Sequence, residues 1–284
     1  MSVARLGQLN YINCLPIYHA IEEGLLPIKA ELVKHPPSKL NALLLNDQLD
    51  ASPISSIEYA RHKNDYLILP DLSVSADGRV MSILLFSKEP VTEMEGKRVC
   101  LTESSATGTA LMKILCDYYF QVEVKYVNAK PDLESMMKKA SGAMLIGDPA
   151  LIAHQAVIDK GLPFHVTDLG KVWKDFTGMK MVYAIWVVRR DFAKANPEMT
   201  ASLWETLHNS KEIGLNQMPA VYEKARKRSG LPLSVLEDYY SLLDHRFDQE
   251  SQKALLTFYD YAFKSGLVDE RVKLHIWGGE DGEN

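Results

Sequence analysis

Two long apolar runs, residues 79–86 and 181–188, most constrain how this chain can fold. Each resembles a buried strand, and the two bracket a self-contained succession of shorter strands and helices. If both runs cross between two lobes, the second lobe is inserted into the first. We then expect residues 1–86 plus 182–284 to form a discontinuous first lobe and residues 87–181 to form the inserted lobe. The alternative is one continuous sheet of seven or eight strands, which periodicity does not exclude.

Strand-like and helix-like segments alternate up to residue 78, which favours a mostly parallel sheet, and a fresh α/β pattern begins at residue 97. The expected strands are residues 3–9, 30–34, 49–54, 66–69, 79–86, 97–101, 122–127, 143–146, 164–167 and 181–188. The expected helices are residues 16–23, 38–44, 55–61, 110–120, 132–140, 149–160, 169–176, 197–215, 220–228, 234–243 and 248–265. Residues 71–78 are interpreted as a polar connection. The prediction is a two-lobed α/β protein with a C-terminal helical region.

Composition narrows the class of protein. With 284 residues, 46% of them hydrophobic, the chain can bury a full core. The net charge of −5 and the lack of a basic block argue against nucleic acid or an anionic membrane as partner. No apolar run approaches the roughly 20 residues of a membrane span, and no signal-peptide pattern opens the chain. Cys14, Cys100 and Cys116 show no CxxC spacing, which argues against a disulfide framework or structural zinc. We therefore expect a reduced, cytoplasmic protein.

Asn10 and Asn13 lie between the first expected strand and a helix that Pro16 opens. In an open α/β sheet, ligands bind at such carboxyl ends of strands, and free N–H groups at a helix start suit an anion. The simpler interpretation is that both asparagines only form the turn, which is their commonest role.

Two further turns resemble the first one. Residues 102–109 carry five hydroxyl groups and Gly108 ahead of a helix, and could hold a carboxylate or phosphate. Gly147-Asp148-Pro149 has the same placement, with Asp148 as the expected N-cap. Helix capping alone would explain both turns. Ser82, on the first crossing run, is a third candidate for a side chain that faces a cleft.

The sequence shows none of the common motifs for nucleophilic, metal or nucleotide chemistry. The sequence contains no GxSxG, HExxH or Cys–His signature, and it lacks both a P-loop and GxGxxG. The histidines, His245 among them, are scattered singly. Trp173, Tyr183 and Trp186 are interpreted as core or cleft wall. What remains is a cleft of neutral hydrogen-bond donors at helix starts, which suits a small di-acid without metal or cofactor.

Four motifs together carry a family resemblance. They are Asn13-Cys-Leu-Pro16, the hydroxyl loop 102–109, Leu145-Ile-Gly-Asp148 and Trp173-Lys-Asp-Phe-Thr177-Gly178. In these, from about Leu6 to the last helix, the chain resembles the chorismate dehydratases of the futalosine-type menaquinone pathway. The resemblance implies a fold like type II periplasmic solute-binding proteins. It also implies a carbon–oxygen lyase that converts chorismate to 3-[(1-carboxyvinyl)oxy]benzoate and water.

The resemblance also suggests roles for single residues. The asparagine that matches Asn13 is tied to catalysis in the family, and the proposed base there is the substrate's own enolpyruvyl carboxylate. Ser82, Ser105 and Thr107 are expected to bind substrate, and Asp148 is a further site candidate. Two alternatives stay open: the sister enzyme that makes 1,4-dihydroxy-6-naphthoate, and a non-catalytic small-anion-binding protein. The sequence gives no indication of oligomeric state.

Overall fold

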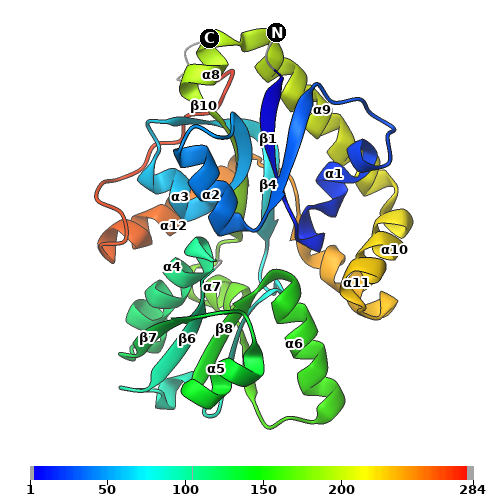
Figure 1. The fold of residues 1–284 in the computed structure, drawn as a ribbon. Coiled ribbons are helices and arrows are strands. Elements are labelled where there is room, and N and C mark those ends of the chain that lie inside the picture. Colours follow the sequence, from blue (N-terminus) through cyan, green and yellow to red (C-terminus); the bar gives the residue numbers. More distant parts are fainter. Residues whose placement is uncertain (1–2, 104, 280–284) are drawn as a thin grey trace.

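Two separate β-sheets, each with its own helices, make up the molecule (Figure 1). The computed structural model describes residues 3–103 and 105–279. The two sheets rule out the single continuous sheet and confirm the two-lobed α/β architecture. Within the described residues, no helix is both long and apolar enough to cross a membrane.

The first sheet has six strands in the order β11-β4-β10-β3-β1-β2. They are β1 Ala4–Leu9, β2 Ala30–His35, β3 Ala51–Ser55, β4 Tyr66–Ala76, β10 Met181–Arg189 and β11 Leu243–Asp244. β1 pairs in parallel with β2 and β3, whereas β10 runs antiparallel to β3 and β4. The helices of this lobe are α1 Leu15–Glu22, α2 Pro37–Leu45, α3 Ser56–Arg61, α8 Arg190–Ala195, α9 Pro197–Asn216, α10 Met218–Ser229, α11 Leu233–Leu242 and α12 Gln249–Lys264.

The second sheet has five strands in the order β7-β6-β8-β5-β9. They are β5 Ile83–Ser87, β6 Arg98–Thr102, β7 Lys125–Ala129, β8 Gly142–Ile146 and β9 His165–Asp168. Its helices are α4 Ala106–Leu115, α5 Leu133–Lys139, α6 Gly147–Lys160 and α7 Leu169–Thr177. Residues 77–82 and 178–180 connect this sheet to the first one.

The first connection differs from the expected one. Residues 83–86, which we grouped with the first lobe, form β5 and pair with β8 and β9 of the second sheet. The segment ahead of them is not a strand. Met81 has a φ of 60°, which an extended strand does not allow, and the Asp168 carboxylate accepts hydrogen bonds from the backbone of Val80 and Met81. The link between the sheets is therefore the short segment 77–82.

The polar connection expected at residues 71–78 is also wrong over most of its length. β4 continues to Ala76, and its second half pairs with β10. Leu72 and Val74 are buried, while the hydroxyls of Ser73 and Ser75 donate to the carbonyls of Arg246 and Asp244. Because backbone carbonyls from another segment satisfy these polar side chains, a sequence that resembles a loop forms a strand.

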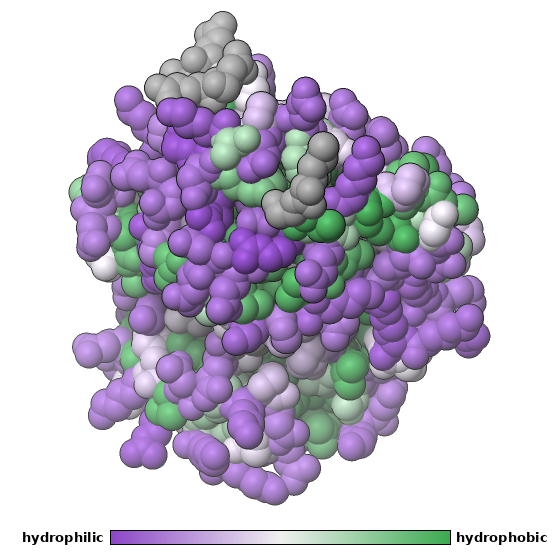
Figure 2. Space-filling view, turned by 45° about the horizontal axis from the view of Figure 1, so that its top comes forward, coloured by the Kyte–Doolittle hydropathy of each residue, from purple (hydrophilic) through white to green (hydrophobic). Residues whose placement is uncertain are grey.

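Close packing fixes the start of α1. A Cβ atom on Gly214 of α9 would lie 2.0 Å from the carbonyl oxygen of Pro16, so only glycine allows the two helices to approach this closely. Trp173 and Trp186 are fully buried, as expected of core residues. On the face shown in Figure 2, hydrophilic residues cover most of the surface and hydrophobic ones appear in small groups.

Candidate active site

A small cavity of about 60 Å³ lies between the two lobes, and we call it the inner cavity. Strands β1, β3 and β8 end at it, with Leu9, Ser55 and Ile146. Asn13, Ser82, Ser105 and Thr107 all line it, so the fold brings together four candidates that are far apart in the sequence. The other lining residues are Tyr11, Pro37, Val74, Val80, Ile83, Gly108, Gly147, Tyr183 and Ala184.

Several helices begin at the inner cavity. Pro37 starts α2, Gly147 starts α6 and Ser105 caps α4, while Asn13 lies in the 3-10 turn two residues before α1. Helix starts carry partial positive charge and free N–H groups, and both stabilise an anion. Among the described lining residues, none has a charged side chain. The cavity is therefore built to bind negative charge through dipoles and hydroxyls rather than through ion pairs.

The Asn13 turn, Ile12–Cys14, is a short 3-10 helix held from several sides. The Ile12 N–H donates to the Asp148 carboxylate at 3.1 Å, the Tyr240 hydroxyl donates to the Ile12 carbonyl, and His245 bonds to the Asn13 carbonyl. The side-chain oxygen of Asn13 is buried and accepts no hydrogen bond from the described residues. A buried acceptor without a hydrogen-bond partner lowers the stability of the fold, so its presence indicates an atom that a bound ligand could satisfy.

The hydroxyl loop supplies both a cap and a lining. The Ser105 hydroxyl accepts from the Gly108 N–H at 3.0 Å and so caps α4, while the same side chain lines the cavity. The Thr107 hydroxyl accepts from the Ile57 N–H at 3.2 Å, which connects α4 to α3 in the other lobe. Ser104 lies outside the described residues. Capping and cavity lining thus coexist in this loop.

Ser82 is the last residue of the 77–82 connection and is buried. Its carbonyl accepts from the Gly147 N–H at 2.7 Å, which ties the connection to the start of α6. Gly147 has a φ of 59°, and a Cβ there would lie 2.9 Å from the Tyr11 ring. Glycine is therefore required at this position both for the backbone conformation and for the contact between lobes.

Asp148 does not cap α6, whose N-cap is Ile146, and it is absent from the cavity lining. Its carboxylate instead reaches across to the Ile12 N–H. Burial raises the pKa of Asp148 to about 6, although this hydrogen bond and Arg228 oppose the shift. Asp148 therefore contacts the Asn13 turn, and through it the site, without facing the cavity.

Sequence reasoning missed Tyr239 and placed Tyr183 only as core or cleft wall. Tyr183 lines the cavity, and its buried hydroxyl has no hydrogen-bond partner among the described residues. The Tyr239 hydroxyl is buried beside Ser82 and Asn13 but makes no well-formed bond to either. Burial raises the pKa of Tyr239, so the phenol stays protonated. No local motif marks Tyr239, since it comes from the helical C-terminal region.

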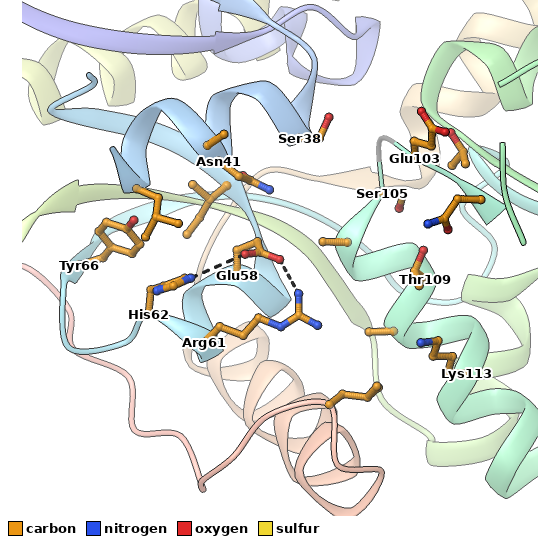
Figure 3. Close-up of a pocket in the computed structure, with 18 residues that line it drawn as sticks. Ser38, Asn41, Glu58, Arg61, His62, Tyr66, Glu103, Ser105, Thr109 and Lys113 are labelled. Atoms are coloured by element: carbon orange, nitrogen blue, oxygen red, sulfur yellow. Dashed lines mark hydrogen bonds and ion pairs between the residues drawn. The ribbon is translucent and has the colours of Figure 1, made fainter. Parts of the chain in front are cut away.

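A larger outer groove of about 460 Å³ adjoins the inner cavity (Figure 3). Figure 3 shows residues of α2 and α3 on one side facing residues of α4 on the other. Glu58 forms ion pairs with Arg61 and lies near His62, and Lys113 lines the opposite wall. Ser105 lines both spaces. The outer groove is thus lined by charged side chains and shares one lining residue with the inner cavity.

One group of described residues could offer three metal-ligand atoms, namely Asp71, His208 and Glu212. It lies away from the residues that line the inner cavity. The buried ammonium group of Lys211 contacts the same Asp71 oxygen as His208, at 2.5 Å. The Lys211 ammonium group is therefore the cation that pairs with Asp71 at this position.

The fold places the protein in a class. Two α/β lobes linked by two connections define the periplasmic-binding-protein-like fold, and solved structures agree. Protein AF1704 from Archaeoglobus fulgidus has a TM-score of 0.77 at 17% identity, covering 93% of this chain and 98% of its own. The periplasmic aliphatic sulphonate binding protein SsuA from Escherichia coli has a TM-score of 0.66 at 15% identity, covering 99% and 94%.

Sequence comparison goes further than the fold. The chain belongs to the menaquinone biosynthesis family, which it matches over residues 4–264. It is 30% identical to a chorismate dehydratase of Thermus thermophilus over 271 residues, 89% of this chain and 93% of that protein. It is 28% identical to the 1,4-dihydroxy-6-naphtoate synthase of the same organism over 199 residues, 68% and 69% of the two chains. The resemblance noted from the motifs is thereby confirmed.

Proposed function

We propose that this protein is a chorismate dehydratase, which converts chorismate to 3-[(1-carboxyvinyl)oxy]benzoate and water. The observation that carries the proposal is the unpartnered Asn13 side-chain oxygen in an uncharged cavity at several helix starts. The relatives named chorismate dehydratase support the substrate.

The chemistry required fits such a cavity. Chorismate carries two carboxylates, and dehydration breaks the bond from a ring carbon to its hydroxyl and the C–H bond on the neighbouring carbon. The hydroxyl leaves with a proton as water, and the ring becomes aromatic. Negative charge spreads into the ring carboxylate when the proton is removed. Fixed donors at helix starts stabilise that charge without having to reorganise.

Asn13 is the residue we assign to catalysis. Its carboxamide offers N–H donors and a free oxygen, so the N–H groups can donate to the ring carboxylate or to the departing hydroxyl oxygen, and the oxygen can accept a hydrogen bond that orients the substrate. Ser82, Ser105 and Thr107 are assigned to substrate binding because their side chains line the same cavity. We assign Asp148 to the site through its bond to the Asn13 turn.

We assign the proton-abstracting base to the substrate itself, because the cavity lining offers none. Among the described residues of the inner cavity there is no histidine, lysine or carboxylate. The substrate's own enolpyruvyl carboxylate is a base already held in the correct place. An intramolecular base of this kind benefits from proximity.

The lobes must separate to admit substrate. The inner cavity of about 60 Å³ is far smaller than the roughly 300–1,000 Å³ of ligand pockets. In the present structure two hydrogen bonds connect the lobes, one from the Ile57 N–H to Thr107 and one from the Ile12 N–H to Asp148. This arrangement corresponds to a closed form that opens at residues 77–82 and 178–180. Solution scattering should show a larger radius of gyration for the protein alone than for the protein saturated with product.

The test is turnover of chorismate followed by mass spectrometry. The wild type should yield a product lighter than chorismate by one water and aromatic by ultraviolet absorbance. Asn10 lies in the same turn region but is exposed, so Asn10→Asp is a matched control that should keep this activity. No product from a folded protein would overturn the proposal. Binding of chorismate without conversion would instead favour a non-catalytic binding protein.

A further inference from the structure

Helix α11 and the segment that follows it hold the Asn13 turn by two hydrogen bonds. The Tyr240 hydroxyl donates to the Ile12 carbonyl at 2.5 Å, and the His245 ring nitrogen Nε2 lies 2.8 Å from the Asn13 carbonyl oxygen. Both side chains are buried, at 5% and 2% exposure. They are more than two hundred residues away from the turn in sequence.

The protonation of both groups follows from their partners. A carbonyl oxygen only accepts, so Nε2 of His245 must carry the proton. Burial lowers the pKa of His245, which keeps the ring neutral and leaves Nδ1 unprotonated. Burial likewise raises the pKa of Tyr240, so its hydroxyl remains a donor. Both bonds are therefore donor-to-carbonyl bonds at neutral pH.

The two carbonyls flank the Asn13 Cα atom. The Ile12 carbonyl belongs to the planar peptide unit before that atom, and the Asn13 carbonyl belongs to the unit after it. Fixing both planes fixes φ and ψ of Asn13, and these angles set the direction of its Cβ. The carboxamide then keeps only its side-chain torsions. Two remote side chains thereby determine where the Asn13 amide points.

We propose that Tyr240 and His245 are positioning residues that aim the Asn13 carboxamide into the inner cavity. The inference rests on the proposed role of Asn13. Neither residue lines the cavity, so each acts through the turn rather than on the substrate. Asp148 adds the support from the other lobe, since its bond to the Ile12 N–H forms only when the lobes meet.

The experiment compares Tyr240→Phe, His245→Met and His245→Gln with a matched control. The control is Tyr59→Phe, which removes another buried hydroxyl that bonds to backbone, but at the far C-terminal segment around Lys273. We expect the first two variants to lower kcat by about 10- to 100-fold, as small misplacements do, with KM nearly unchanged. His245→Gln, which keeps a donor near the Nε2 position, should restore most of kcat. Tyr59→Phe should keep it.

A second arm separates positioning from a general loss of structure. In an Asn13→Ala background, Tyr240→Phe should cause little further loss, because the residue through which it acts is gone. An equal loss in both backgrounds would overturn the proposal. So would an unchanged kcat in Tyr240→Phe and His245→Met proteins that are folded by circular dichroism.

A third arm does not depend on activity. In protein labelled with 15N-asparagine, the side-chain amide signal of Asn13 should shift or broaden in Tyr240→Phe and stay in place in Tyr59→Phe. If wild type fails to convert chorismate while this signal responds, the proposed function is wrong and the positioning role stands. An Asn13 signal that is identical in wild type and Tyr240→Phe would overturn the positioning role whatever the activity.

Discussion

The inner cavity and the outer groove lie side by side between the same two lobes, and Ser105 lines both, yet they differ in charge and size. The inner cavity measures about 60 Å³ and its described lining is uncharged. The outer groove measures about 460 Å³ and is lined by Glu58, Arg61, Glu103 and Lys113. By volume alone the outer groove would be chosen as the site, whereas the chemistry of its lining favours the inner cavity, as we propose.

The difference bears on the proposed dehydration of a dianion. Charged groups in the outer groove are neutralised by each other or screened by water, as with Glu58 and Arg61. The inner cavity is small and its described lining is uncharged, so fixed dipoles act there with little screening. It also contains buried polar atoms without partners, on Asn13 and Tyr183. Unfilled hydrogen-bonding capacity is a better indicator of the reacting centre than volume.

Among the substitutions in the two spaces, Asn13→Asp in the inner cavity should reduce turnover most. The substitution keeps shape but replaces N–H donors with a negative charge beside a dianion. We expect turnover to fall by about 10²–10³, the usual cost of one preorganised donor, with a normal melting temperature. Steady-state kinetics and calorimetric melting of the variant beside Asn10→Asp check this. A variant that melts normally and retains most of its turnover would show that Asn13 only forms a turn.

Asp148→Asn tests, through stability, whether the carboxyl group beside the Asn13 turn is buried. The pKa of Asp148 is raised to about 6 in the fold, so the native state binds the proton more tightly than the unfolded chain. Stability from this group is therefore lost as pH rises from about 4 to 6. Asparagine carries no charge to bury and its side-chain oxygen can still accept from the Ile12 N–H. The Asp148→Asn protein should therefore be more stable than wild type by up to about 3 kcal/mol above pH 6.

The same variant should match wild type near pH 4. Urea unfolding at pH 4 and pH 7.5 measures both differences. A difference between variant and wild type that does not change with pH would contradict the buried, shifted carboxyl group.

Ser105→Ala affects both spaces and should have a moderate effect. The loss of the hydroxyl that accepts from Gly108 removes the α4 cap, at about 1 kcal/mol of stability. If the hydroxyl also contacts substrate, KM should rise, and Ser105→Thr should recover part of both losses. Asp132→Ala, which removes the cap of α5 away from the cavity, is the matched control for capping alone. Equal kinetics for the Ser105→Ala and Asp132→Ala proteins would assign Ser105 to capping only.

Lys113→Met should have the smallest effect. Lys113 lines only the outer groove and is partly exposed, so its charge is screened. We expect kcat/KM at moderate salt to stay within about threefold of wild type. A loss as large as that of Asn13→Asp would move the site to the outer groove and reverse the comparison.

The sequence predicted the parts that depend on local pattern. Two long apolar runs around a self-contained α/β unit predicted the two-lobed fold, and the turns at Asn13 and Ser105 could be named because each lies between a strand and a helix. Contacts between distant segments could not be predicted in this way. Asp148 resembles a cap but binds Ile12, and His245 resembles a scattered histidine but holds the Asn13 carbonyl. Such roles depend on which segments the fold brings together, and no spacing encodes them.

The strand β4 illustrates the same limit in the fold. Its second half contains Asp71, Ser73 and Ser75, which favour loops in isolation, and tertiary partners overrode that preference. The first connection was misplaced for a related reason. Apart from Ser82, apolar residues continue from Val80 into β5, so hydropathy does not mark the backbone change at Met81.

The most direct test of the central claim is a crystal structure with 3-[(1-carboxyvinyl)oxy]benzoate bound. We predict ligand density in an enlarged inner cavity, with a carboxylate at the start of α4 near Ser105 and the ring within hydrogen-bond or contact distance of the Asn13 carboxamide. The outer groove should hold no ordered ligand. Density confined to the outer groove, with the Asn13 side chain unchanged and untouched, would contradict the account.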